Sequence, residues 1–223
     1  MKISAIIPTR GTRLKEIEII KKFIHSFFDE VIIAADIGNK VYARYEAILR
    51  AKNDIIYTQD DDCLVNNITE LIIKYENDKI VANSMRGRKK FYRKISNGRI
   101  NLIGYGSIFN KKLVSNIFHF KEWLNDPELF NRECDRVFTY FNKIKLIDVS
   151  IQEFPSSKSG MCTDYNHKNS LYQTLYKLNE YDQHFISNKF INPIIIKTFC
   201  GKLSLSKEVR HFFSKTNTKL PSI

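Results

Sequence analysis

The stretch Asp54-Ile-Ile-Tyr-Thr-Gln-Asp-Asp-Asp62 joins a short apolar run to three consecutive carboxylates. Its first five residues predict a buried strand. Asp60, Asp61 and Asp62 stand at the carboxyl end of that strand, where they repel one another and resist ionisation. A divalent cation would relieve the repulsion, because Mg²⁺ and Mn²⁺ prefer hard oxygen ligands and bind through one or two carboxylates plus substrate phosphates. The alternative is a solvated acidic turn that caps the next helix.

Strands alternate with helices on both sides of the triplet. Apolar runs and helical spacing place these elements at 3–8, 14–28, 30–35, 41–52, 68–75 and 79–84. The alternation predicts an α/β fold with a Rossmann-like, mostly parallel central sheet flanked by helices. Ligands bind beyond the carboxyl ends of strands in such sheets. Thr9, Arg10 and Asp36 follow strands as the triplet does, so we expect three polar clusters to meet on one rim.

The pattern changes after residue 85. The segment 86–99 is basic, contains aromatic residues, lacks acids and carries an Asn97-Gly98 hairpin signal. Further strands are expected at 102–109 and 145–151, and helices at 112–120, 127–141 and 171–178. We therefore predict one domain at 1–178, with a donor half to about 85 and an acceptor half at 86–178, and a small, basic, helical C-terminal extension at 179–223.

Composition and termini narrow the class of protein. The 223 residues carry a net charge of +12, which favours anionic partners such as nucleotides, phosphorylated lipids, acidic polymers or nucleic acid, although a genome bias toward lysine gives the same excess. The four cysteines are far apart and form no Cys-x-x-Cys pair, so neither a zinc cluster nor a disulfide framework is expected. The N-terminus does not read as a signal peptide and no apolar run has the roughly 18 residues of a membrane span. We expect a cytoplasmic, reduced protein.

A family resemblance rests on several of these motifs together. Ile6-Ile-Pro-Thr9 and the run from Ala47 to Asp62 resemble the nucleotide-sugar-binding half of glycosyltransferases with the A-type (GT-A) fold, whose hallmark is an Asp-x-Asp motif at this place. The form Gln-Asp-Asp-Asp is similar to that of small viral and bacterial members and of the exostosin-like group. The resemblance also takes in Gly104–Phe109, Glu133–Thr139 and Gly160–His167, and covers roughly residues 3 to 175.

The resemblance implies a donor site built on the triplet. Asp62 would hold Mn²⁺ or Mg²⁺, which bridges the donor diphosphate. His167 would be a second metal ligand, the alternative being a structural or exposed histidine. Asp60 would face the ribose or sugar, and Asp61 would support both neighbours. The nucleoside pocket would be formed by Thr9, Arg10, Asp36 and Asn39. Arg44 would reach the base or a phosphate, with a solvated helix face as an equal alternative.

The same resemblance places the chemistry on the segment around Glu133. Inverting transfer needs a base for the acceptor hydroxyl. Asp135 is expected to be that base and Glu133 an acceptor or sugar contact. Cys134 replaces one acid of the adjacent pair found in similar enzymes, so the register of the pair is open by a residue or two, and Asp126 competes for the role. The alternative is an exposed helical pair beside Arg132 and Arg136.

Four residues are predicted to lie on the acceptor side. Arg88 and Lys89 would bind an anionic acceptor, the alternative being a solvated hairpin. Tyr105 and Trp123 would stack on sugar faces, although aromatic residues more often belong to the core.

These expectations describe a metal-dependent glycosyltransferase that moves a sugar from a nucleoside-diphosphate donor, favoured to be uridine-linked, to a hydroxyl of a glycan, lipid-linked or polymeric acceptor with inversion. Two alternatives are a nucleotidyltransferase and a basic nucleic-acid-binding module. Pro8–Arg13 is a poor match to the Gly-rich, Lys-bearing loop of the first, and the second leaves the triplet unexplained. The basic tail from about residue 183 either packs on the domain or contacts an anionic membrane surface.

Overall fold

The computed structural model describes residues 1–36, 38, 40–84, 100–155 and 167–188. Asn39, Arg88, Lys89 and the basic segment around the last two lie outside the described residues, as does the tail from residue 189. No helix in the described part of the chain has the length and apolar character needed to cross a membrane.

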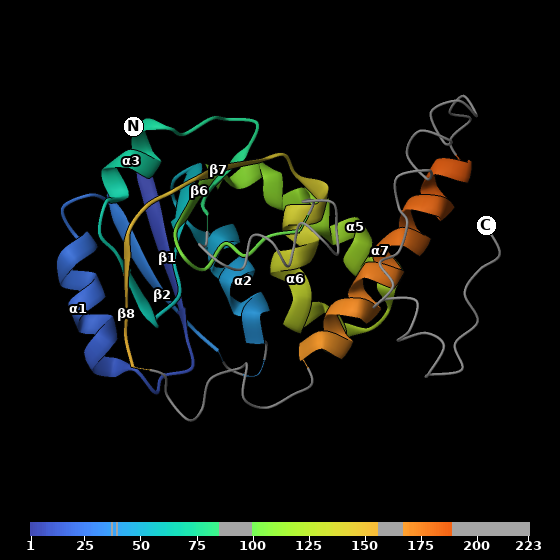
Figure 1. Ribbon diagram of the computed structural model, residues 1–223, viewed down its shortest axis with the longest axis horizontal. Coiled ribbons are helices and arrows are strands. Elements are labelled where there is room, and N and C mark those ends of the chain that lie inside the picture. The colour runs from blue at the N-terminus through green and yellow to red at the C-terminus, as the bar shows by residue number, and fades with distance from the viewer. Residues whose placement is uncertain (37, 39, 85–99, 156–166, 189–223) are drawn as a thin grey trace.

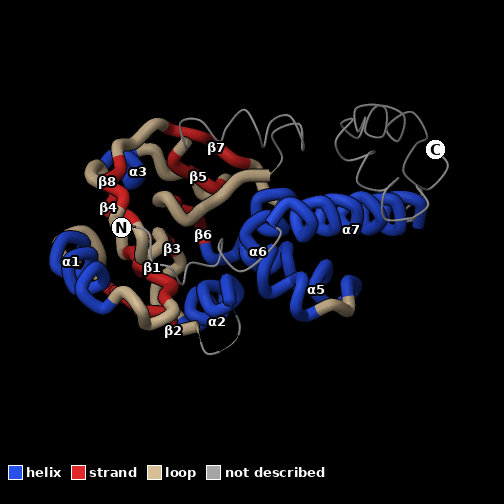
Figure 2. The backbone as a smooth tube through the Cα atoms, turned by 60° about the horizontal axis from the view of Figure 1, so that its bottom comes forward, coloured by secondary structure: helices blue, strands red, loops and turns tan. Residues whose placement is uncertain are grey.

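The central sheet (Figure 1) has six strands. Their order is β2-β1-β3-β6-β5-β7, which can be followed in Figure 2. Its strands are β1 (Ile3–Thr9), β2 (Glu30–Ala35), β3 (Ile55–Thr58), β5 (Ile80–Asn83), β6 (Ser107–Asn110) and β7 (Ile144–Ile147). β1 pairs in parallel with β2 and β3, and β5 pairs in parallel with β7. β6 runs antiparallel to both of its neighbours, β3 and β5. The prediction of a mostly parallel central sheet is confirmed, with one reversed strand at its middle.

A second, two-stranded sheet begins directly after the triplet. β4 (Cys63–Val65) pairs antiparallel with β8 (Ile151–Glu153), and the Phe154 N–H donates to the Asp62 carbonyl at 2.8 Å. The strand expected at 145–151 is therefore two strands, β7 and β8, in different sheets. β4 was not predicted, because three residues are too short a run to show a period.

The helices occupy most of the expected places. They are α1 (Leu14–Ile24), α2 (Ala43–Arg50), α3 (Ile68–Ile73), α5 (Phe118–Leu124), α6 (Pro127–Phe141) and α7 (His167–Asn188), with 3₁₀ turns η1 (Lys40–Tyr42) and η2 (Lys111–Ile117). The helix expected at 112–120 is thus η2 followed by α5. α7 is longer than expected and runs without a break through residue 178, where we placed the end of the domain.

Helices cover both faces of the sheet (Figures 1 and 2). Successive residues of β1 point to opposite faces, so Ile7 packs in the core beneath α1 and α3, while Ile6 packs in the core beneath α2 and α6. α7 adds to the core beneath α2 and α6 through Tyr181, whose ring centroid lies 5.3 Å from that of Phe120 on α5. The larger helical layer lies on the side of the sheet from which α2 and α6 approach the triplet.

Candidate active site

The triplet fills the gap between the end of β3 and the start of β4, against the segment that precedes β6. The Asp60 N–H donates to the Gly104 carbonyl at 2.6 Å. The Asp60 carboxylate lies directly over Gly104, since a Cβ at that position would be 2.7 Å from Oδ1 and closer still to Cγ and Oδ2. Glycine is therefore required by close approach, and Gly104 belongs to the site although it has no side chain.

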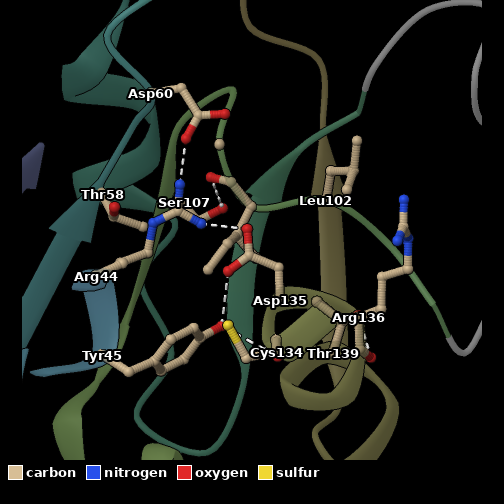
Figure 3. Close-up of polar contacts among 12 residues, drawn as sticks. Arg44, Tyr45, Thr58, Asp60, Leu102, Ser107, Cys134, Asp135, Arg136 and Thr139 are labelled. Atoms are coloured by element: carbon tan, nitrogen blue, oxygen red, sulfur yellow. Dashed lines mark hydrogen bonds and ion pairs between the residues drawn. The ribbon is translucent and has the colours of Figure 1, made fainter. Parts of the chain in front are cut away.

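Arg44 on α2 is the buried centre of the site. One terminal nitrogen of its guanidinium donates to Asp60 and the other to Asp135 on α6, as Figure 3 shows. Only 2% of the Arg44 side chain is exposed, against 38% for Asp60 and 12% for Asp135. Burial alone would lower the pKa of Arg44, but the two carboxylates outweigh it and hold the guanidinium charged. The sequence left open a solvated position for Arg44, and the structure places the side chain in the interior instead.

Asp135 is also held by Tyr45, which follows Arg44 on α2. The Tyr45 hydroxyl donates to Asp135 Oδ1 at 2.9 Å, while Arg44 donates to Oδ2 (Figure 3). Burial, followed by the charge of Asp135, raises the pKa of Tyr45 well above its usual value, so the hydroxyl stays protonated and remains a donor. Two neighbouring residues of α2 thus engage both oxygens of one carboxylate.

Arg13 lies beside the other two aspartates. Its Nε is 3.9 Å from Asp61 Oδ1, and its Nη1 is buried without a hydrogen-bond partner among the described residues. Thr9 joins Arg13 in lowering the pKa of Asp61, but burial of Asp61 is the largest influence and the net shift is upward. Arg13 was not predicted as a site residue, and the signal that could have revealed it is its place in the loop after β1, on the rim already assigned to ligands.

The three carboxylates all resist ionisation in this arrangement. Burial raises the pKa of Asp60 to about 7, with Arg44 opposing the shift and the charges of Asp62, Asp135 and Asp61 adding to it. Burial and then the charge of Asp61 likewise raise the pKa of Asp62. The repulsion expected from three adjacent acids is therefore present despite two arginines.

Asp62 offers the clearest place for a cation. Its Oδ1 is buried and has no hydrogen-bond partner among the described residues. A buried carboxylate oxygen without a donor is costly unless a cation or ligand group satisfies it. No group of three or more His, Cys, Asp or Glu side chains forms a ready metal cage within the described ranges. The single available oxygen of Asp62 is compatible with Mg²⁺, which binds proteins through one or two carboxylates and takes its remaining ligands from water and phosphates.

The second strand end meets the first, as expected. The Asp36 N–H donates to the Thr9 carbonyl at 2.7 Å, and Asp36 Oδ2 lies 3.8 Å from Arg10 Nε. Asp36 Oδ1 accepts from the backbone N–H groups of Gly38 and Lys40, at 2.9 and 2.7 Å. Asp36 therefore shapes the turn before η1, and its predicted contact with a nucleoside remains a prediction.

The two acids of the Glu133-Cys-Asp135 motif point to different partners. Residues two apart on an α-helix lie about 200° apart around its axis. Asp135 faces Arg44, while Glu133 is 1% exposed, accepts from the Ser170 hydroxyl of α7 at 2.6 Å and forms an ion pair with Arg136. The structure therefore separates Glu133 from the triplet's polar contacts and ties it to α7.

The remaining predicted residues are placed as follows. Asp126 caps α6, its side chain accepting from the Leu129 N–H at 3.0 Å. Tyr105 is buried between the two glycines next to the triplet. Trp123 packs against Tyr181, with ring centroids 5.4 Å apart, in the aromatic cluster of α5 and α7. His167 is the first residue of α7, and its side chain lies outside what the structure describes.

One solved structure, that of a mannosyltransferase, supports the fold. No family model matches the sequence, and no curated protein matches it. A mannosyltransferase from Pyrobaculum calidifontis, PcManGT, solved with GDP-Man and Mn²⁺, is 11% identical over 97% of this chain and 84% of its own, with a TM-score of 0.50. Glucosyl-3-phosphoglycerate synthase from Mycobacterium tuberculosis, solved with Mn²⁺, UDP and phosphoglyceric acid, is 12% identical over 79% of this chain and 78% of its own, with a TM-score of 0.45. S. aureus TarS, solved with UDP-GlcNAc, is 12% identical over 79% of this chain and 66% of its own, with a TM-score of 0.44.

Proposed function

We propose that this chain is a metal-dependent glycosyltransferase, which uses a nucleoside-diphosphate sugar as donor and a hydroxyl as acceptor. The architecture is that of a GT-A fold, which the chain shares with PcManGT. The observation that carries the proposal is the Asp62 carboxylate, which has a buried, unsatisfied oxygen within an acidic row that two arginines do not neutralise. A divalent ion bound there would satisfy that oxygen and attract a diphosphate.

The roles follow from the positions of the side chains. Asp62 would hold Mn²⁺ or Mg²⁺, and the bound ion would stabilise the charge on the departing diphosphate. Asp60, whose carboxylate is partly exposed, would contact the ribose or sugar, and Arg10 with Asp36 would line the nucleoside pocket. Asp61, held near Thr9 and Arg13, would support its neighbours.

The acceptor is a glycan, lipid-linked or polymeric hydroxyl in this proposal, and the donor a uridine diphosphate sugar, with inversion at the sugar carbon. Asp135 remains the predicted base, because it is the carboxylate of α6 that faces the triplet through Arg44. Contact of the tail with an anionic membrane surface also remains a prediction.

Calorimetric titration and thermal melting test the proposal. We expect Mn²⁺ with UDP or GDP to raise the melting temperature far more than either alone, and one member of a nucleotide-sugar panel to bind when Mn²⁺ is present. Asp62→Ala should abolish the joint effect, while Asp78→Ala, which removes an exposed aspartate paired loosely with Lys143, should retain it. Binding of nucleoside triphosphates without binding of any diphosphate sugar would favour a nucleotidyltransferase. A shift with duplex DNA alone would favour the nucleic-acid module, and either result would refute the proposal.

A further inference from the structure

We propose that Asp135 is a positioning residue of the donor site: with Tyr45 it fixes Arg44, and Arg44 in turn fixes Asp60. This inference rests on the proposed function for its ligand, but its geometry is independent of the chemistry. Asp135 need not touch a donor or acceptor to play this part.

The contacts form one line from the interior to the rim. Asp135 on α6 holds Arg44 on α2, and Arg44 holds Asp60 at the end of β3 (Figure 3). Exposure rises sharply at the last step, from 2% of the Arg44 side chain to 38% of the Asp60 side chain. Asp60 is therefore the member of the line that a ligand can reach, and the other two act on a ligand through it.

The Asp60 carboxylate has little else to hold it. The carboxylate lies against Gly104, which limits its movement on that side. Among the described residues, Arg44 is the hydrogen-bond donor to the Asp60 side chain. A carboxylate at the rim that lost Arg44 would be free to adopt other rotamers, and a ligand would have to order it again at a cost in binding free energy.

Arginine is the residue that suits this position. Its planar fork presents two separate terminal nitrogens, so one guanidinium can fix the directions of two carboxylates at once, whereas a lysine ammonium acts as a single point charge. The fork is set in turn from Asp135, because Tyr45 holds the far oxygen of that carboxylate at 2.9 Å. The line thus links α6, in the second half of the chain, to the acidic triplet of the first half.

Calorimetric titration of UDP in the presence of Mn²⁺ tests the line on the full chain. Each variant is measured at a temperature where circular dichroism shows it folded. We expect Asp135→Asn and Arg44→Lys each to weaken binding by about 10- to 100-fold, the loss expected when a hydrogen bond between the ligand and the charged Asp60 is no longer well made. The double variant should bind UDP no more weakly than the single variant with the larger loss of affinity, because both changes interrupt the same series of contacts from Asp135 to Asp60. Glu18→Gln, which removes an exposed ion pair with Lys21 on α1, is the control and should bind as the wild type does.

Chemical rescue separates positioning from general loss of structure. Methylguanidinium added to Arg44→Gly should restore binding of UDP with Mn²⁺, and methylammonium should not. Unchanged binding by Asp135→Asn, or equal rescue by the two cations, would overturn the inference. Loss of sugar transfer with unchanged binding in Asp135→Asn would identify it as the base alone.

A ligand-free measurement decides the inference even if the proposed function fails. If the wild type binds no nucleoside diphosphate with Mn²⁺, the proposed function is wrong, and a double-mutant cycle in urea unfolding still tests the line. Asp60→Asn and Asp135→Asn should then have non-additive effects on stability, because Arg44 couples them, whereas strict additivity would refute the coupling.

Discussion

Gly104→Ala is the substitution whose consequence the structure specifies most directly. The added Cβ would lie 2.7 Å from Asp60 Oδ1 and nearer still to Oδ2 and Cγ, where ordinary contacts begin near 3.4 Å. Residue 104 cannot easily move away, because its carbonyl accepts from the Asp60 N–H at 2.6 Å. The carboxylate must therefore rotate, and it loses its contact with Arg44 as it does so. The change acts on the triplet without altering any charged group.

The expected cost differs between stability and binding. An off-rotamer Asp60 side chain costs about 0.5–1.5 kcal/mol, and the lost hydrogen bond to the buried guanidinium of Arg44 costs about 1.5–3 kcal/mol more. For a chain of this length the sum corresponds to a fall in melting temperature of about 4–18 °C. Binding of UDP with Mn²⁺ should weaken by about 10- to 100-fold, since the displaced Asp60 carboxylate no longer makes its hydrogen bond to the ligand.

Gly106→Ala provides the contrast. Its Cβ would lie 2.9 Å from a methyl group of Val65, and its φ of +98° is unfavourable for any residue with a Cβ. Left-handed backbone strain and overpacking together should cost about 2–5 kcal/mol of stability. No atom of the triplet is among its near contacts, so the folded fraction should bind UDP with Mn²⁺ normally. Wild-type binding by Gly104→Ala would refute the reasoning, as would a loss of binding by Gly106→Ala larger than that by Gly104→Ala.

Three further predictions concern the scaffold. Asn83→Ala should destabilise the protein by about 2–4 kcal/mol in urea unfolding, because its buried amide donates to two carbonyls and accepts from the Val149 N–H; an unchanged midpoint would contradict this. Ser170→Ala should cost about 1–3 kcal/mol by leaving a Glu133 oxygen without its hydroxyl donor, and Ser170→Thr, which keeps the hydroxyl, is its comparison. Hydrogen bonds from two lysines lower the pKa of Glu76 to about 2, so its contribution to stability is present above the unfolded pKa near 4.5 and is lost as pH falls toward 2. Glu76→Gln should therefore reduce the loss of stability across that window, and an acid-unfolding profile identical to the wild type would count against it.

The sequence was sufficient to place the acidic triplet at the rim of the sheet, but not to predict that Arg44 is buried behind it. The triplet could be placed because a strand, its carboxyl end and the following acids are all local features. Arg44 could not, since its burial depends on Asp60 and Asp135, which are 16 and 91 residues away in the chain. Helical spacing alone leaves an arginine beside a tyrosine equally compatible with solvent.

Strand direction was also beyond the sequence. The apolar run that forms β6 is equally compatible with a parallel and an antiparallel strand, and only its pairing between β3 and β5 settles the direction.

The two acids of the Glu133-Cys-Asp135 motif could be placed from the sequence. Their spacing on a predicted helix already implies opposite faces, so helix geometry alone predicts different partners for the two acids, which the structure shows to be Ser170 and Arg44.

The charges around the triplet explain how a basic chain can hold a site for a cation. Four carboxylates, Asp60, Asp61, Asp62 and Asp135, stand against the guanidiniums of Arg13 and Arg44. Fully ionised, the group would carry two negative charges, and the neighbouring carboxylates add to burial in raising the pKa of Asp60. In the proposed function, a divalent ion would restore the balance of charge and remove the repulsion that a diphosphate would otherwise meet. The net charge of +12 would then act at longer range, drawing anionic ligands toward a centre that would accept them only after its metal is bound.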